Sequence, residues 1–166
     1  AAGDININAN QIRVLNGAQI RANTGASRSS AGGDGGDINI HAWEFIEIKG
    51  SLPSNPFTGA LSRVSSDTYS NSSAGQVNIV VGDGDLVVSD RGNISSQVQS
   101  GSSGNGGSVN VSANNILLQE GGQINAGTFG FGDGGTLTIT ASNSVQVTGE
   151  ADGAPSGFFT ATFGYG

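Results

Sequence analysis

The chain has 166 residues, of which 29 are glycine and none is cysteine or methionine. Its 6 basic and 13 acidic residues give a net charge of −7, which argues against a surface for nucleic acid or anionic membrane. The lack of cysteine excludes disulfides and thiolate metal sites, and no apolar run approaches the roughly 20 residues that a membrane-spanning helix needs.

A short pattern, glycine followed by alternating apolar and polar residues, recurs along the whole chain. Its copies begin near residues 3, 36, 75, 107 and 135, at intervals of 33, 39, 32 and 28 residues. Each copy opens a unit of three short apolar segments, separated by residues that suit tight corners, such as Asn114-Asn115 and Gly121-Gly122. Because the alternation has a period of two, each segment is predicted to be a strand with one buried face.

The units predict an order of strands from one end of the chain to the other. Unit by unit, the expected strands lie near 4–7, 11–14 and 19–22; 37–40, 45–48 and 63–66; 76–79, 86–88 and 93–96; 108–111, 116–118 and 123–126; and 136–139, 145–147 and 158–161. The second unit contains an insertion, residues 51–61, which holds Pro53 and Pro56. Since proline cannot donate to a central ladder, this segment is expected to leave the sheets.

Stacking the units places like residues beside like. Three inward columns are predicted: Ile5, Ile38, Val77, Val109 and Leu137; Ile7, Ile40, Ile79, Val111 and Ile139; and Ile20, Val64, Ile94, Ile124 and Phe159. The residues between the first two columns point outward and are Asn6, Asn39, Asn78, Asn110 and Thr138. Side-chain amides stacked in this way can hydrogen-bond from one unit to the next.

A unit of three short strands cannot bury its apolar face alone and needs copies above and below it. Parallel stacking and the preferred right hand of parallel crossovers then give the expected fold. It is an all-β, right-handed parallel β-helix of about five coils, with three sheets and variable loops, and residues 1–166 form a single array. Because methionine is absent and the last residues echo 126–132, the chain is expected to be a fragment of a longer array.

The units also share a longer pattern, which reads GGQINAGTFGFGDGG at residues 121–135. They resemble the repeats of filamentous-haemagglutinin-like bacterial exoproteins of the two-partner secretion type, especially the cyanobacterial ones, most closely over 107–135. The resemblance implies a β-helical adhesin that is exported through an outer-membrane transporter. It also implies a secreted, extracellular location at the cell surface of a bacterium and a role in adhesion or aggregation.

Residues that could carry chemistry are sparse. The one histidine, His41, follows inward-facing Ile40 and is expected on the outer face, with no second histidine or cysteine to complete a metal or catalytic site. Asp83, Asp85 and Asp90 lie close in sequence. A polar corner is their expected role, and the alternatives are Ca²⁺ binding and catalysis on an acidic sugar. No catalytic residue and no cofactor is expected, apart from that alternative of Ca²⁺.

Six aromatic residues are candidate binding residues. They are Trp43 and Phe45 in the second unit, Phe129 and Phe131 in the fourth, and Phe163 and Tyr165 in the fifth. The simpler interpretation is that they cover the corners of the coils. The alternative is a platform that binds glycans or a protein partner.

The expected function is therefore not enzymatic. We expect a structural or adhesive segment of a secreted or cell-surface β-helical exoprotein, active in adhesion, aggregation or an extracellular fibre, with recognition placed in its variable loops. The alternative is a polysaccharide-acting, pectin-lyase-like β-helix enzyme or a carbohydrate-binding module. The expected partners are cell-surface glycans or proteins and further copies of the chain, joined end to end through open strand edges.

Overall fold

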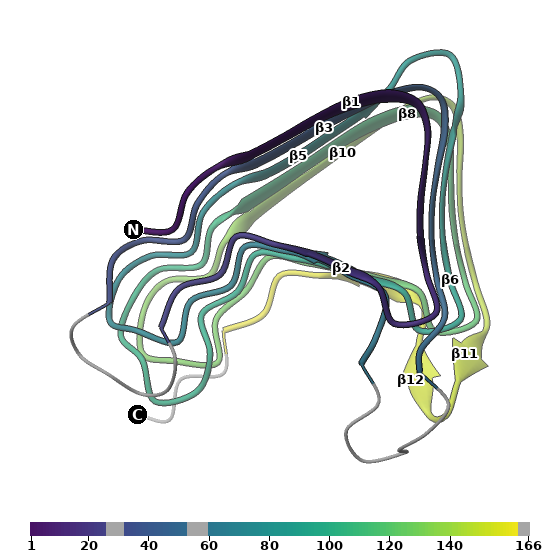
Figure 1. Cartoon of the computed structure of the whole chain (residues 1–166). Coiled ribbons are helices and arrows are strands. Elements are labelled where there is room, and N and C mark those ends of the chain that lie inside the picture. The colour runs from purple at the N-terminus through teal and green to yellow at the C-terminus, as the bar shows by residue number, and fades with distance from the viewer. Residues whose placement is uncertain (26–31, 53–59, 163–166) are drawn as a thin grey trace.

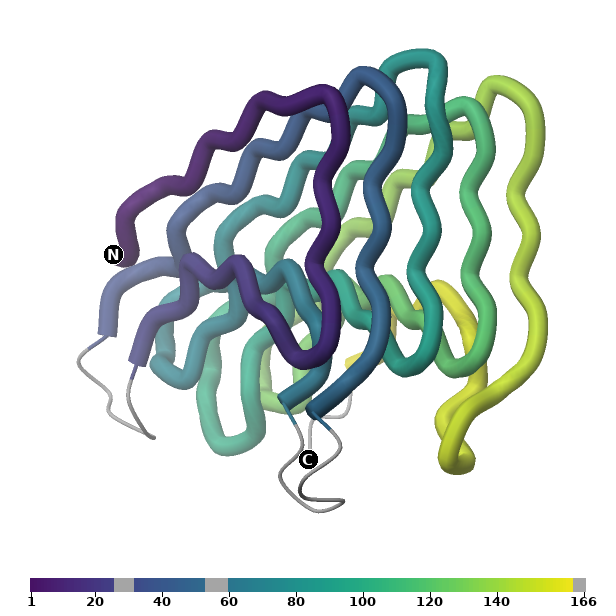
Figure 2. Tube along the Cα trace, turned by 45° about the vertical axis from the view of Figure 1, so that its right-hand side comes forward, coloured from purple at the N-terminus to yellow at the C-terminus, as the bar shows by residue number. Residues whose placement is uncertain are grey.

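The chain is built from strands that lie side by side in successive passes (Figure 1). The computed structural model describes residues 1–25, 32–52 and 60–162, and this part of the chain contains thirteen strands and no helix. The path turns through the same directions in each pass, and each pass is displaced from the one before it (Figure 2). The fold is all-β with parallel sheets, as the sequence predicts.

The first sheet is wholly parallel and has six strands: five follow the order β1-β3-β5-β8-β10, and the sixth, β6, pairs with β3 and β8. Its strands are β1 (Ile5–Leu15), β3 (Ile38–Lys49), β5 (Val77–Val81), β6 (Asp85–Ser89), β8 (Ser108–Gln119) and β10 (Thr136–Thr148). Every pass therefore contributes to this sheet.

Most strands of the first sheet contain two of the predicted strands, joined by a bend. The register shifts at the bend, between Ala9 and Gln11 in β1 and between Ala141 and Ser144 in β10. Only the third pass is interrupted, between β5 and β6. The first and second predicted strands of a pass therefore belong to one bent sheet. An irregularity in the ladder turns the strand without ending it, so that Asn114 and Asn115 lie inside β8.

The second sheet is also parallel, in the order β13-β9-β7-β4-β2. Its strands are β2 (Gln19–Arg21), β4 (Arg63–Ser65), β7 (Asn93–Ser95), β9 (Gln123–Asn125) and β13 (Gly157–Phe159). A row of single bridges follows it and joins Thr24, Thr68, Val98, Thr128 and Thr162 in turn. The last pass adds an antiparallel pair, β11 (Glu150–Ala151) and β12 (Ala154–Pro155), which projects at a corner (Figure 1).

The corner between the two sheets needs a left-handed backbone. Residues with positive φ occur there in every pass: Asn16 and Gly17, Gly50, Asp90 and Arg91, Glu120 and Gly121, and Gly149. Glycine adopts this conformation without a steric cost, and asparagine and aspartate tolerate it better than most residues. The corner residues that are visible in the sequence as breaks between apolar segments thus turn the chain from one sheet to the other.

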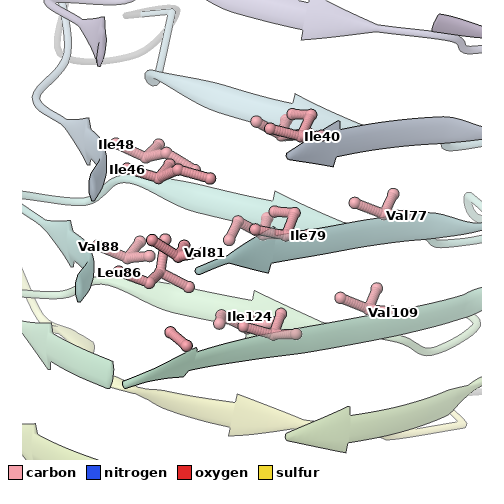
Figure 3. Close-up of a cluster of buried hydrophobic side chains, with 14 of the residues drawn as sticks. Ile40, Ile46, Ile48, Val77, Ile79, Val81, Leu86, Val88, Val109 and Ile124 are labelled. Atoms are coloured by element: carbon pink, nitrogen blue, oxygen red, sulfur yellow. The ribbon is translucent and has the colours of Figure 1, made fainter. Parts of the chain in front are cut away.

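The core lies between the two sheets, where apolar side chains of successive passes gather (Figure 3). The first two predicted inward columns are confirmed, because the strand register pairs Ile5 with Ile38 and Val77 with Val109, and continues in this way to Leu137 and Ile139. In the inner passes these side chains are completely or almost completely buried. Alternation with a period of two is sufficient to place them.

The third predicted column is correct for four passes and wrong for the last. Phe158, not Phe159, pairs with Ile124 and packs against the core. Phe159 points outward, where its ring covers Gly157: a Cβ added to Gly157 would lie 2.6 Å from the ring. The bare face of Gly157 gives the Phe159 ring a place on the outer surface, so the side chain need not enter the core.

The insertion of the second pass leaves and re-enters at one point. Ser51 forms an antiparallel bridge with Leu61, and the Leu52 amide donates to the Ala60 carbonyl at 3.1 Å. Pro53 and Pro56 lie outside the described residues. The insertion therefore departs from the sheets beside the corner between β3 and β4, as the sequence predicts.

Candidate functional site

The outer face of the first sheet carries the predicted asparagine ladder. Asn39 Nδ2 donates to Asn6 Oδ1 at 3.1 Å, Asn78 Nδ2 to Asn39 Oδ1 at 2.9 Å, and Asn110 Nδ2 to Asn78 Oδ1 at 2.8 Å. Thr138 follows next in register. These amides join one pass to the next, so they serve the scaffold and leave little hydrogen-bonding capacity for a ligand.

His41 lies on the same outer face, as predicted. Its neighbours in register are Asn8 and Val80, and its ring lies 4.4 Å from that of Trp43, tilted by 49°. Trp43 is half exposed, at 50%. The pair forms an aromatic contact on the outer face.

Phe45 is partly covered by a cation. The Arg13 guanidinium lies 4.4 Å from the centre of the Phe45 ring, and Arg13 Nε is 3.5 Å from Glu47 Oε2. A cation held over an aromatic face in this way links the first pass to the second. Phe45 therefore offers less open surface than Trp43.

The structure separates the three candidate carboxylates. Asp85 is the first residue of β6 and Asp83 lies in the bend before it, whereas Asp90 lies beyond the end of β6, at the corner. Asp85 Oδ1 accepts from Asn115 Nδ2 at 2.8 Å, and Arg91 pairs with Asp152 at 3.3 Å. No group of three histidine, cysteine, aspartate or glutamate side chains that could hold a metal ion is found in the described part of the chain.

Phe129 and Phe131, two of the remaining aromatic candidates, lie in the loop that follows β9 (Gln123–Asn125). Phe129 is 39% exposed and Phe131 is 66% exposed. Phe163 and Tyr165 lie outside the described residues, so their predicted stacking on Phe129 and Phe131 remains a prediction. Phe129 also borders a groove.

This groove, of about 360 Å³, lies on the outer face of the second sheet, across three passes. From one side to the other it is lined by Leu61; by Arg63, Asn93 and Gln123; by Ser95 and Asn125; by Asp67 and Gln97; and by Tyr69, Gln99 and Phe129. Arg63, Asn93 and Gln123 occupy corresponding positions in β4, β7 and β9, and so do Ser95 and Asn125 in β7 and β9. Asp67 and Gln97 follow β4 and β7 at corresponding positions. Because equivalent residues repeat along the stack, the groove runs from pass to pass.

Asp67 is the buried charge at the groove, with 1% of its surface exposed. Its Oδ1 accepts from Ser95 Oγ and from the Gln97 amide, both at 3.0 Å. Burial raises the pKa of Asp67 above the ordinary 3.8, against the opposing effect of these hydrogen bonds and of the nearby Arg63 and Arg21 charges. The carboxylate therefore fastens the second pass to the third at some electrostatic cost.

The side-chain amides of the groove differ from those of the asparagine ladder in their hydrogen bonding. Within the described part of the chain, the side chains of Asn93, Gln97, Gln99 and Asn125 make no hydrogen bond. Arg63 Nε is buried without a hydrogen-bond partner among these residues. The groove thus holds polar groups that the fold does not use, which is the property expected of a binding surface.

The sequence interpretation missed this groove. The signal was present in the outward positions of the third strands, where Arg63, Asn93 and Gln123 succeed one another. Of the aromatic candidates that the structure describes, only Phe129 borders the groove.

Comparisons with protein-family models, with curated proteins and with solved structures found no match to this chain. The described residues contain no helix that could cross a membrane.

Proposed function

We propose that the chain is a right-handed parallel β-helix of five coils that serves as a non-enzymatic structural or adhesive segment of a secreted or cell-surface exoprotein. The observation that carries the proposal is the asparagine ladder, together with the aligned apolar columns beneath it. Polar and apolar side chains alike are used to join one pass to the next. Such a chain is suited to extending a surface, and variable segments can be added at its corners.

The resemblance to filamentous-haemagglutinin-like exoproteins supports a bacterial, extracellular setting and export through an outer-membrane transporter. The adhesive part of the proposal is tested with beads that carry the chain. Beads coated with the 166-residue chain should adhere to bacterial cells or clump them, whereas beads coated with heat-unfolded chain should not. Equal adhesion by the two kinds of bead would contradict a role that depends on the folded surface.

The runner-up is a pectin-lyase-like enzyme on the same scaffold. Cleavage of an acidic polysaccharide requires clustered carboxylates and cations, whereas the groove contains one carboxylate, Asp67, and one cation, Arg63, among its described residues. Incubation with polygalacturonate should give no unsaturated or reducing products, with or without added Ca²⁺. Product formation that is lost in Asp67→Asn would favour the enzyme instead.

We further propose that copies of the chain join end to end. Val145 and Val147 face inward in register with Ile116 and Leu118, yet they are 48% and 41% exposed because no further pass covers them in the described chain. The β1 strand of a second copy would continue the parallel ladder, and its Ile12 and Val14 would lie over these two valines. Apolar side chains would again stack on apolar side chains, as they do between the passes of one chain.

Sedimentation velocity tests this association. The mean sedimentation coefficient should rise with protein concentration and should stay at the monomer value in Val145→Lys, because a charge at the open end opposes stacking. Val80→Lys, which places the same charge on an exposed valine of the outer face, is the matched control and should still associate. A monomer at all concentrations would contradict the proposal.

A further inference from the structure

We infer that the groove on the second sheet binds a neutral, hydroxyl-rich polymer, an uncharged polysaccharide chain that lies along the direction in which the passes stack. This inference rests on the proposed β-helical scaffold and names what its surface would recognise. It assigns the binding to the groove and not to the exposed aromatic face around Trp43.

The first step concerns hydrogen-bonding capacity. Asn93, Gln97, Gln99 and Asn125 each present an amide that the described fold does not engage. An amide offers two donors and an acceptor with two lone pairs, and a sugar hydroxyl both donates and accepts. A row of amides can therefore satisfy a row of hydroxyls without burying a charge, while displacing the water that occupies the groove.

The second step concerns repeat length. Parallel strands are about 4.8 Å apart, so equivalent groove residues recur at that interval from Arg63 to Asn93 and from Asn93 to Gln123. This interval is similar to the advance of one sugar residue in an extended chain. Successive sugars can then meet successive passes with the same kind of contact.

The third step concerns the rims. Tyr69 and Phe129 stand along one edge of the groove and Leu61 along the other. Aromatic rings offer flat apolar faces, and a sugar ring has an apolar C–H face as well as polar edges. The combination of an amide floor with aromatic edges matches both surfaces of a sugar.

The fourth step excludes other extended polymers. The net charge of −7 and the single Arg63 in the groove oppose nucleic acids and acidic polysaccharides. An extended peptide would seek an open strand edge for main-chain hydrogen bonds, whereas the groove floor is the face of a sheet whose strands are already paired. An uncharged, hydroxyl-rich chain is the polymer that the groove chemistry favours.

The test is native electrophoresis of the 166-residue chain through gels that contain a soluble polysaccharide. The neutral probes are hydroxyethylcellulose, galactomannan and dextran, and the acidic probes are polygalacturonate and alginate. We expect retardation in at least one neutral gel and none in the acidic gels. Retardation in no neutral gel, or in the acidic gels alone, would overturn the inference.

A double variant places the binding in the groove. Asn93→Ala with Gln97→Ala removes two unengaged amides and should weaken association with the retarding polymer about tenfold or more. The matched control, Asn8→Ala with Gln146→Ala, removes the same two groups from the outer face of the first sheet and should bind like wild type. Equal weakening of both double variants, or loss of binding in Trp43→Ala but not in the groove variant, would contradict the assignment.

Two further measurements separate binding from folding. The far-ultraviolet circular dichroism and melting temperature of each variant report on the scaffold, so that an unfolded wild-type chain would count against the proposed fold, not against the ligand class. If the double variant unfolds, the side-chain amide NMR signals of wild-type protein are followed as cellohexaose or mannohexaose is added. The signals of Asn93, Gln97, Gln99 and Asn125 should shift, and shifts confined to the asparagine ladder would overturn the inference.

Discussion

Asn23 and Asp67 occupy equivalent places in successive passes and make the same contacts. Asn23 Oδ1 accepts from Ser65 Oγ at 3.1 Å and from the Asp67 amide at 3.0 Å, just as Asp67 Oδ1 accepts from Ser95 Oγ and the Gln97 amide. One side chain is neutral and the other ionisable. In the first pass an uncharged residue thus makes both contacts, although Asn23 Nδ2 is buried without a hydrogen-bond partner among the described residues.

Asp67→Asn should make the protein more stable at neutral pH. Because burial raises the pKa of Asp67 in the folded chain, the folded state holds its proton more tightly than the unfolded state does. The stability that this proton contributes is fully present below the unfolded-state pKa of about 3.8 and is lost as the pH rises through the raised, folded-state pKa. Asparagine avoids this loss, but its Nδ2 would be buried as that of Asn23 is, so we expect a net gain of less than about 1 kcal/mol in the free energy of unfolding, or less than about 4 °C in melting temperature.

Thermal unfolding of the two proteins between pH 3 and pH 8 measures the effect. The gain from Asp67→Asn should disappear toward the acid end of this range. A variant that is less stable than wild type at neutral pH would show that the hydrogen bonds to the carboxylate outweigh its burial.

Asn78 is the central member of the ladder and both donates and accepts within it. Asn78→Ala removes two hydrogen bonds between passes and should lower the free energy of unfolding by about 1 kcal/mol. Gln76→Ala is the control, since Gln76 is exposed beside the start of β5 and its side chain makes no hydrogen bond with the described residues. Equal denaturation midpoints for wild type and Asn78→Ala in urea would contradict a stabilising role for the ladder.

At the scale of the strand, most positions follow from alternation, and the exceptions have local causes. Successive residues of a strand face opposite sides of the sheet, so alternation alone determines which residues form the inward columns. The sequence therefore predicts these columns for the first sheet. The long strands β1, β3, β8 and β10 were not predicted, because a bulge can turn a strand without the glycine or proline that marks a corner in sequence. The prediction that Phe159 is the inward residue of β13 was wrong, because Gly157 leaves space for the Phe159 ring on the outer surface.

The two phenylalanines of β13 provide a direct test of that register. Phe158→Ala removes a ring packed on the core and should cost about 2 kcal/mol, less than a fully buried phenylalanine because the last pass is open on one side. Phe159→Ala removes an outward ring, 37% exposed, and should cost under about 1 kcal/mol. Urea unfolding of both variants that gave the reverse order would restore the register predicted from the sequence.

At the scale of the whole molecule, the repeat predicts the parallel stacking, but it does not predict the groove. Stacking depends on each unit and its nearest neighbours, and the same apolar pattern occurs in all five units of the sequence. The groove depends on what three different passes place side by side, for example Asn93 beside Gln123 and Asp67 near Arg63. Outward residues are not constrained by the core, so their meaning appears only when the register between passes is known.

The stacking itself is the claim on which the scaffold, the end-to-end contact and the groove all depend, and distances between paired spin labels measure it directly. The chain has no cysteine, so labels attach only at introduced sites. Asn8, Ser112 and Thr140 belong to one outward column. Along the stack, Ser112 is three strands away from Asn8 and Thr140 is four strands away. At about 4.8 Å a step, labels at Asn8→Cys and Ser112→Cys should lie about 14 Å apart between backbones, and those at Asn8→Cys and Thr140→Cys about 19 Å apart. Narrow distributions that differ by about one step would support the account, and broad or equal distributions, or the reverse order, would contradict it.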